Sequence, residues 1–196
     1  MTEREQGHRP ALGGSDWPYQ SLPDTRLDAR LDAFTYRIID TPLDEMLIAR
    51  TDAGLVRVAF AREGFAQVIE YLTEKLHPRP APARQSLDDA ARAIEAYFAG
   101  AAKTVPLALD LQLAIGFRRA VVDHLPSIAY GSTASYSQVA AAVGRPGSAR
   151  AVGVACRSNP LPIVLPCHRA VRSDGSIGGY VGGTEAKRVL LALEAA

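Results

Sequence analysis

The chain of 196 residues is long enough for one large domain or two small ones around a substantial hydrophobic core. Apolar residues make up 47% and charged residues 22%, as in an average soluble protein, and no apolar run approaches the ~20 residues of a membrane span. The N-terminus lacks the apolar segment of a secretory signal and two cysteines are too few for a disulfide scaffold, so we expect a reducing, cytoplasmic location.

Charge is unevenly distributed, although the formal net charge is only +1. Residues 117–196 carry nine Lys or Arg and four Asp or Glu, which leaves residues 1–116 negative. A positive C-terminal part indicates a polyanion partner such as nucleic acid. An excess of this size is common, so charge alone leaves the partner open.

The N-terminal half predicts a tail followed by an α+β scaffold. Residues 1–32 contain Gly-Gly, three prolines and no periodic apolar pattern, so we expect a disordered tail that Trp17 and Tyr19 could attach to the surface. The runs TYRII, MLIAR and LVRVAF indicate strands, and residues 51–54 a hairpin turn in which Gly54 supplies any positive φ.

Two helices are predicted after these strands. In residues 64–76 the apolar positions fall on one face, and residues 87–99 follow Ser86, a suitable N-cap, and end before Gly100. Residues 104–111 are expected to be extended. No motif in this half indicates chemistry.

From residue 117 the chain is predicted to be mainly helical. FRRAVVDHL forms one helix that ends before Pro126, and Ser135 with Gln138 fits a capping box. The helix that begins at this capping box ends at Gly144, and Ser148 opens a further short helix. Two short helices joined by a turn that contains glycine form a helix-turn-helix pattern, which many proteins share without touching DNA.

The segment LPIVLPCHRAV contains the residues most suited to chemistry. Its prolines exclude a helix and predict an extended loop that leads to Cys167. Cys167 could be a buried structural thiol, a metal ligand or a nucleophile. A metal site needs three or four ligands at suitable spacing, and the other histidines are scattered, so we expect no metal.

Three blocks of sequence in this order resemble the O6-alkylguanine-DNA alkyltransferase family. They are SYSQVAAAVGRPGSARAVGVACRSNP, which ends in Ser158-Asn159-Pro160, then Pro166-Cys167-His168-Arg169, and finally Gly179-Tyr180-Val181-Gly182-Gly183. The resemblance spans residues 115–196. It implies an α+β fold, with a ribonuclease H-like α+β domain at 33–112 and a mainly helical, winged-helix-like domain with the helix-turn-helix at 113–196.

The resemblance also implies an activity. A member of this family repairs DNA by direct reversal, as a methylated-DNA–[protein]-cysteine S-methyltransferase. The alkyl group of O6-alkylguanine in double-stranded DNA would pass irreversibly to Cys167, once per molecule, with no cofactor. We expect a monomer. Activity on O4-alkylthymine and cooperative assembly on DNA stay open.

Three residues would form the reacting centre. By the resemblance, Cys167 attacks the alkyl carbon, His168 acts through a water, and Glu194 orients His168. The sequence draws attention to Glu194 independently, because it shares a helical face with Leu190 and Leu191 and a carboxylate there needs a partner. The alternative is a frayed, exposed residue near the chain end.

Other roles follow from the same resemblance. Tyr136 would donate a proton or hydrogen bond to the departing guanine, and Asn159 would tie the helix-turn-helix to the cysteine loop. Arg150 would enter the base stack in place of the extruded nucleotide, with its helix in the minor groove. Small neighbours would let that helix approach the DNA: Ser148, Ala149, Ala151 and Gly153.

The guanine pocket would lie along Tyr180, Val181 and Gly182, with Lys187 nearby and Ala170 in its wall. The family usually has valine in place of Ala170 and frequently serine in place of Val181, so the fit of this pocket is in question.

Two alternatives to alkyl transfer remain at this point. One is a protein that binds alkylated DNA without catalysis, although such relatives typically carry tryptophan in place of the cysteine. The other is a cysteine hydrolase, which the sequence favours least because no separate Cys/His/Asn pattern is present. The alkyltransferase hypothesis requires an ionised sulfur at the mouth of a cavity for an everted purine, backed by the histidine and the glutamate.

Overall fold

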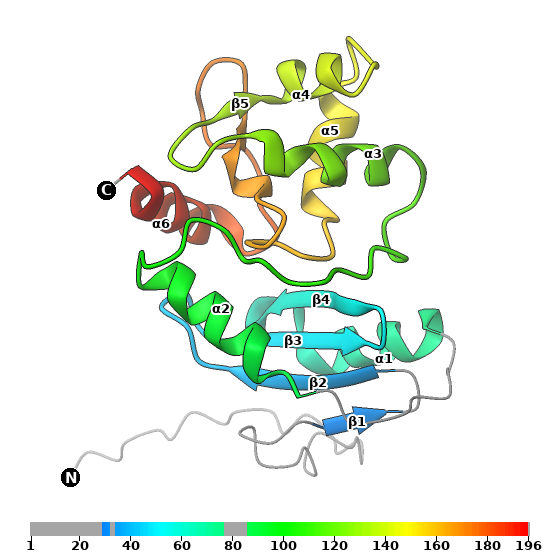
Figure 1. Cartoon of the computed structure of the whole chain (residues 1–196). Helices are drawn as coiled ribbons and strands as arrows, with labels where there is room; N and C mark the ends of the chain where they lie inside the picture. The colour runs from blue at the N-terminus through cyan, green and yellow to red at the C-terminus, as the bar shows by residue number, and fades with distance from the viewer. Residues whose placement is uncertain (1–28, 32–33, 77–85, 196) are drawn as a thin grey trace, which may run out of the picture.

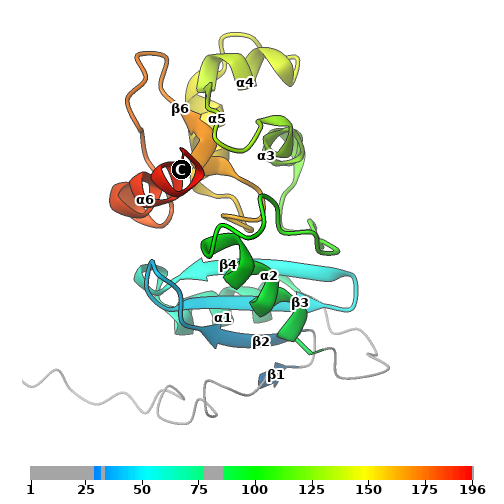
Figure 2. The same ribbon diagram turned by 60° about the vertical axis from the view of Figure 1, so that its left-hand side comes forward.

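The computed structural model describes residues 29–31, 34–76 and 86–195, so most of the predicted tail, with Trp17 and Tyr19, lies outside the described residues. Figure 1 shows two parts. One is a sheet with helices α1 (Phe65–Lys75) and α2 (Asp88–Phe98). The other is a helical part that runs from α3 (Gly116–His124) to α6 (Gly183–Ala195), and the segment between α2 and α3 lies between the two parts. Strand β4 (Gly54–Phe60) is the strand of the sheet nearest to the helical part in both Figure 1 and Figure 2.

The sheet is an antiparallel meander in the order β1-β2-β3-β4. Its strands are β1 (Ala29–Leu31), β2 (Phe34–Ile39), β3 (Met46–Thr51) and β4 (Gly54–Phe60). The three strands expected from Phe34 onward are confirmed. Strand β1 falls inside the predicted tail, which was therefore too long: its backbone pairs with β2 without needing a periodic apolar pattern.

The hairpin between β3 and β4 requires its glycine. Gly54 has a φ of +139°, a conformation that side chains disfavour. A β-carbon there would also lie 2.4 Å from the carbonyl oxygen of Ala108. The predicted turn is confirmed, and the close approach of residue 108 explains why this strand cannot begin with a larger residue.

Each face of the sheet has its own helix. Helix α1 (Phe65–Lys75) covers one face through Phe65, Val68 and Leu72, and α2 (Asp88–Phe98) covers the other through Ala90, Ile94 and Tyr97. Both predicted helices are confirmed to within a residue or two. Ser86 acts one residue before the formal N-cap: its side chain accepts a hydrogen bond of 3.1 Å from the Asp88 amide.

The helical part follows the predicted order. Its elements are α3 (Gly116–His124), η3 (Leu125–Ser127), β5 (Ala134–Ser135), α4 (Tyr136–Ala142), α5 (Ala149–Arg157), η4 (Cys167–Arg169), β6 (Ala170–Val171) and α6 (Gly183–Ala195). The capping box is present, because Gln138 N donates to Ser135 Oγ at 3.1 Å and Ser135 N donates to Gln138 Oε1 at 2.7 Å.

The two parts are joined along the outer edge of β4. The Leu55 amide donates to the Ala108 carbonyl at 2.8 Å, and the Val58 amide donates to the Pro160 carbonyl at 2.9 Å. These contacts cover an edge that would otherwise offer unpaired amides. One hydrophobic core continues from α2 into the helical part. None of the helices in the described ranges is long and apolar enough to cross a membrane.

Candidate active site

Cys167 begins the single turn η4, at the end of the proline-containing loop that follows α5. The prolines predicted an extended loop, but the loop is folded. The Leu165 amide donates to the Leu161 carbonyl at 2.8 Å, and Ile163 has a φ of +75°. Prolines exclude a helix, but buried amides still need acceptors, so the loop closes a local turn. This turn places Cys167 inside the protein, where the residue is only 1% exposed.

Asn159 holds this loop together. Its side-chain amide donates to the Leu165 carbonyl at 2.8 Å, and its Oδ1 accepts from the Leu161 amide at 3.0 Å. Asn159 is fully buried and directly follows the end of α5. It therefore connects the second helix of the helix-turn-helix to the cysteine loop, which is the position expected for it.

The carboxylate of Glu194 lies at the centre of a buried hydrogen-bond cluster. Its Oε1 is 2.7 Å from His168 Nε2 and accepts from the Tyr97 hydroxyl at 2.6 Å. Arg169 donates through Nε to Oε2 at 2.9 Å and through Nη2 to Oε1 at 3.0 Å, and the Gly131 amide donates to Oε2 at 3.2 Å. Glu194 is 4% exposed, so the alternative of a frayed terminal residue is wrong.

These contacts set the charges of the cluster. Burial raises the pKa of Glu194, but hydrogen bonds from His168, Arg169 and Tyr97 outweigh it, and the pKa falls to about 2. Burial lowers the pKa of His168 below its usual value, despite the opposing effect of Glu194. Neutral His168 must then carry its proton on Nε2, facing the carboxylate. Its Nδ1 has no hydrogen-bond partner among the described residues and is free to accept a proton.

The state of Cys167 differs from the expectation of an ionised sulfur at a cavity mouth. Burial raises the pKa of its thiol to about 11, and the opposing effects of Asn159 and Lys187 offset only part of that shift. The low dielectric that surrounds the sulfur disfavours a thiolate. Cys167 is thus a buried thiol, and a thiol of this pKa would need a proton acceptor in order to act as a nucleophile.

Tyr136 and Lys187 lie together next to the cysteine. The Tyr136 hydroxyl donates to the Gly179 carbonyl at 3.5 Å, and Lys187 Nζ lies 5.7 Å from the centre of the Tyr136 ring. Lys187 is fully buried and donates to the Ala170 carbonyl. Burial and the nearby cysteines raise the pKa of Tyr136, so its phenol keeps its proton at neutral pH.

The residues expected along the guanine pocket do not all face outward. Tyr180 is buried and packs edge-on against Phe60 of β4, with ring centres 5.6 Å apart, and against His168 at 6.4 Å. Val181 and Gly182 are half-buried. Tyr180 therefore packs between His168 and the sheet and does not line the rim of a pocket.

Helix α5 presents the residues expected to meet DNA. Arg150 and Ala151 are exposed, whereas Ser148, Ala149 and Gly153 are half-buried. Arg150 carries the one long side chain among these five residues, and the other four are small. An accessible helix of this kind can approach a groove closely.

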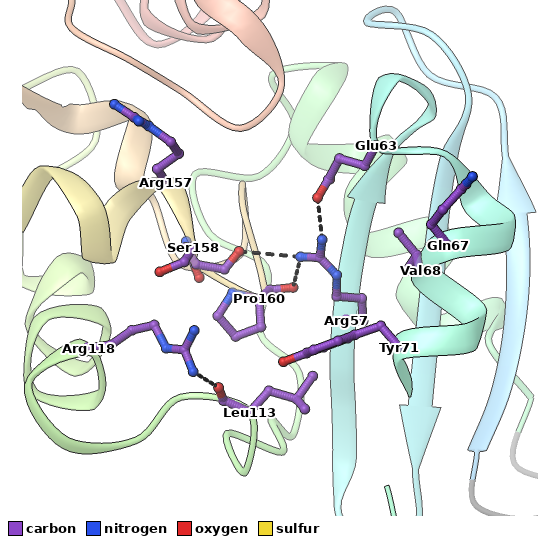
Figure 3. A pocket seen from close by; sticks show the side chains of 11 residues that line it. Arg57, Glu63, Gln67, Val68, Tyr71, Leu113, Arg118, Arg157, Ser158 and Pro160 are labelled. Carbon is purple, nitrogen blue, oxygen red and sulfur yellow. Dashed lines mark hydrogen bonds and ion pairs between the residues drawn. The ribbon is translucent and has the colours of Figure 1, made fainter. Parts of the chain in front are cut away.

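A cavity of about 310 Å³ lies where α1, β4 and the end of α5 meet (Figure 3). Arg57 of β4 donates to the carbonyl oxygens of Pro160 at 3.2 Å and Asn159 at 3.4 Å, and it pairs with Glu63. Cys167 is not among the lining residues. This cavity marks the junction between the two parts.

Three functional candidates were missing from the sequence prediction. Tyr97 repeats the spacing of Ala90 and Ile94, so it reads as an ordinary core aromatic, and nothing local reveals the partner of its hydroxyl. Arg169 lies inside the cysteine motif, but its partner Glu194 is 25 residues further along the chain. Arg57 lies on strand β4, and the sequence of that strand does not indicate that Arg57 contacts the loop at Asn159 and Pro160.

Comparison with known proteins identifies the family. Residues 34–111 match the model for the ribonuclease-like domain of 6-O-methylguanine DNA methyltransferase, and residues 116–196 match its DNA binding domain. A methylated-DNA--protein-cysteine methyltransferase of Mycolicibacterium paratuberculosis is 37% identical over 159 residues, which cover 81% of this chain and 91% of that protein. The chain belongs to the 6-O-methylguanine DNA methyltransferase family.

Further relatives agree. The constitutive methylated-DNA--protein-cysteine methyltransferase of Bacillus subtilis is 37% identical over 163 residues, covering 81% of this chain and 94% of the relative. The crystal structure of Mycobacterium tuberculosis OGT in complex with DNA has a TM-score of 0.68 at 35% identity and covers 82% of this chain and 92% of its own. The predicted family and fold class are confirmed. In the described ranges no three His, Cys, Asp or Glu side chains are grouped so as to hold a metal.

Proposed function

We propose that this protein repairs alkylated DNA by transferring the alkyl group of O6-alkylguanine to Cys167, irreversibly and once per molecule. The observation that carries the proposal is the buried cysteine directly followed by His168, whose Nε2 is 2.7 Å from Glu194. This is a nucleophile beside a base, with a third group that orients the base. The family and the activity named for its relatives point the same way.

The chemistry follows from the protonation states. The thiol of Cys167 loses its proton toward His168 Nδ1, directly or through a water, and the sulfur attacks the alkyl carbon. The S–C bond forms as the C–O6 bond breaks, and the electron pair stays with the guanine. Tyr136 is protonated and supplies a hydrogen bond or proton to that leaving group. Lys187 stabilises the thiolate as it forms, because its charge lowers the pKa of Cys167. Nothing in this scheme releases the thioether, so one molecule repairs one lesion.

The partner is double-stranded DNA that bears the damaged base, bound by a monomer of this protein in the cytoplasm through the minor groove. A solved relative is in complex with DNA, and residues 116–196 match a DNA binding domain. Because Cys167 is almost completely buried, the guanine must leave the base stack and displace part of the chain that covers the sulfur. Arg150, exposed on α5, takes the place of the extruded nucleotide.

Mass spectrometry of the intact protein tests the proposal. After incubation with a duplex that contains O6-methylguanine, the wild-type chain and Cys156→Ala should each gain one methyl group, and the label should map to the Cys167 peptide. Cys167→Ser should gain none. Complete repair with an unmodified Cys167 contradicts the assignment, and binding of methylated DNA without transfer favours the non-catalytic alternative.

A further inference from the structure

Helix α2 belongs to the part of the chain in which the sequence shows no chemistry, yet its Tyr97 reaches the reacting centre. We infer that Tyr97 is a positioning residue for alkyl transfer: its hydroxyl fixes the Glu194 carboxylate and thereby the tautomer of His168. The inference rests on the proposed function and adds a contribution of the ribonuclease-like domain to the chemistry of the other domain.

The contact is short and shielded from solvent. Tyr97 is 1% exposed, and its hydroxyl lies 2.6 Å from Glu194 Oε1 and 3.3 Å from His168 Nε2. Burial and the neighbouring carboxylate raise the pKa of Tyr97, so the hydroxyl keeps its proton. An ionised carboxylate can only accept, which means that Tyr97 is the donor. A donor held at this distance to a charged acceptor is among the stronger hydrogen bonds of a protein.

The two carboxylate oxygens of Glu194 have different tasks. Oε2 accepts from Arg169 Nε and from the Gly131 amide, whereas Oε1 accepts from Tyr97, from Arg169 Nη2 and from His168. Tyr97 and His168 thus bind the same oxygen. The hydroxyl draws part of the negative charge away from the imidazole and stops the carboxylate from turning about its own axis.

The other ionisable groups around His168 act on it in different ways. Arg169 of η4 and Lys187 of α6 are cations, and both act to lower the pKa of His168. Cys167 precedes it, and Tyr180 packs edge-on against its ring with no hydrogen-bond partner for its own hydroxyl among the described residues. Of these groups, only Arg169 also donates to Glu194.

Removal of the Tyr97 hydroxyl should raise the pKa of His168. In Tyr97→Phe the carboxylate loses a donor and becomes more basic, so it stabilises a charged imidazole more strongly. The pKa of His168 then rises, and a larger share of the molecules carries a protonated histidine that cannot accept the thiol proton. The transfer rate should fall, most of all at acidic pH, and the acid side of the pH profile should move upward.

Two substitutions separate the hydroxyl from the packing of the ring. Tyr97→Phe keeps the edge-on contacts of its ring with Phe98 at 5.7 Å and with Tyr130 at 6.3 Å. Tyr130→Phe removes a hydroxyl from the same aromatic group, but one that bonds the Leu193 main-chain carbonyl at 3.4 Å rather than a carboxylate. It is the matched control.

The experiment follows transfer of a labelled methyl group from duplex DNA under single-turnover conditions, from about pH 5 to about pH 9. The final amount of label counts folded, active protein, and the rate constant reports the chemistry. For Tyr97→Phe we expect a rate about tenfold lower near pH 6 and an acid limb displaced to higher pH, with the full amount transferred. Tyr130→Phe should keep the wild-type rate and profile.

The outcomes distinguish a failure of the proposed function from a failure of the inference about Tyr97. If the wild-type protein takes up no methyl group, the proposed function fails. If the wild type reacts and Tyr97→Phe matches its rate and pH profile, the inference about Tyr97 is overturned. A smaller final amount of label with an unchanged rate also overturns it, because Tyr97 would then serve only stability.

Discussion

Glu194 shows how one residue can set the charge of its neighbours. Its carboxylate pairs with Arg169 and makes hydrogen bonds with Tyr97 and His168. A buried ion pair is tolerated only when its hydrogen-bonding capacity is filled, and here five donor atoms from four residues share the two oxygens. The buried thiol of Cys167 directly precedes a histidine whose pKa is lowered and whose Nδ1 has no hydrogen-bond partner among the described residues. At the residue scale, these protonation states support the proposal that His168 accepts the thiol proton at the moment of reaction.

Glu194 also predicts how stability depends on pH. Its pKa is about 2 in the folded protein against 4.5 ordinarily, so it contributes stability above the ordinary value that is lost as pH falls toward 2. The free energy of unfolding should drop steeply between about pH 5 and about pH 2. Glu194→Gln should lose about 3 kcal/mol at neutral pH, because Arg169 stays buried without its counter-charge, and should flatten the acid slope.

Urea denaturation at a series of pH values measures both effects. Glu185→Gln serves as control, since Glu185 lies on the same helix and its side chain is 79% exposed. A Glu194→Gln curve parallel to the wild type would contradict the assigned pKa.

At the scale of elements, the helix-turn-helix owes its shape to local signals and its surface to small residues. The capping box starts α4, and Gly144, with a φ of +73°, ends it. Helix α5 buries Val152, Ala155 and Cys156 and leaves Arg150 and Val154 outside, Val154 with 62% exposure. An apolar and a cationic side chain on one accessible helix suit contact with bases and phosphates together.

Arg150 should therefore matter for duplex DNA and not for chemistry as such. Arg150→Ala should slow methyl transfer from a duplex by about tenfold or more, because the extruded base can return to the stack. Reaction with a free alkylguanine base should keep its rate. Arg119→Ala, which removes an exposed arginine paired with Asp123 on α3, should leave both rates unchanged. Stopped-flow or quenched assays give the two rates, and equal losses on both substrates would argue against insertion into the stack.

Across the whole molecule, the ribonuclease-like domain supports the reacting centre from two sides. Tyr97 of α2 binds Glu194, and Arg57 of β4 binds the carbonyls that flank the start of the cysteine loop. Phe60 packs against Tyr180, and a β-carbon at Gly182 would collide with the Phe60 ring at 2.7 Å. The position of the loop is thus fixed by a domain that carries no nucleophile.

This arrangement predicts that the junction stabilises the protein. Arg57→Met should lower the free energy of unfolding by about 2 kcal/mol, because two carbonyls lose a charged donor and the largely buried Glu63 loses its partner. Arg188→Met, which breaks an exposed pair with Glu185, should change it by less than about 0.5 kcal/mol. Chemical denaturation measures the difference, and equal effects would show that Arg57 contributes no more than a surface ion pair.

Much of this architecture is determined by sequence alone. The hairpin at Gly54, the capping box at Ser135 and the buried face of α1 follow from hydrogen bonds and periodicity within a few residues. The motif around Cys167 indicated the family and pointed to Glu194. Such features are local, or they repeat a pattern that a single stretch of chain contains.

The tertiary structure decided the rest. The sequence predicted an extended loop and an ionised sulfur, whereas folding closes the loop and buries the thiol, and burial raises its pKa. Tyr97 and Glu194 are 97 residues apart, and Arg57 and Asn159 are 102 apart. No local pattern encodes the partner of a hydroxyl or a guanidinium at that separation. Such contacts, and the low dielectric that sets each pKa, exist only once distant segments have packed together.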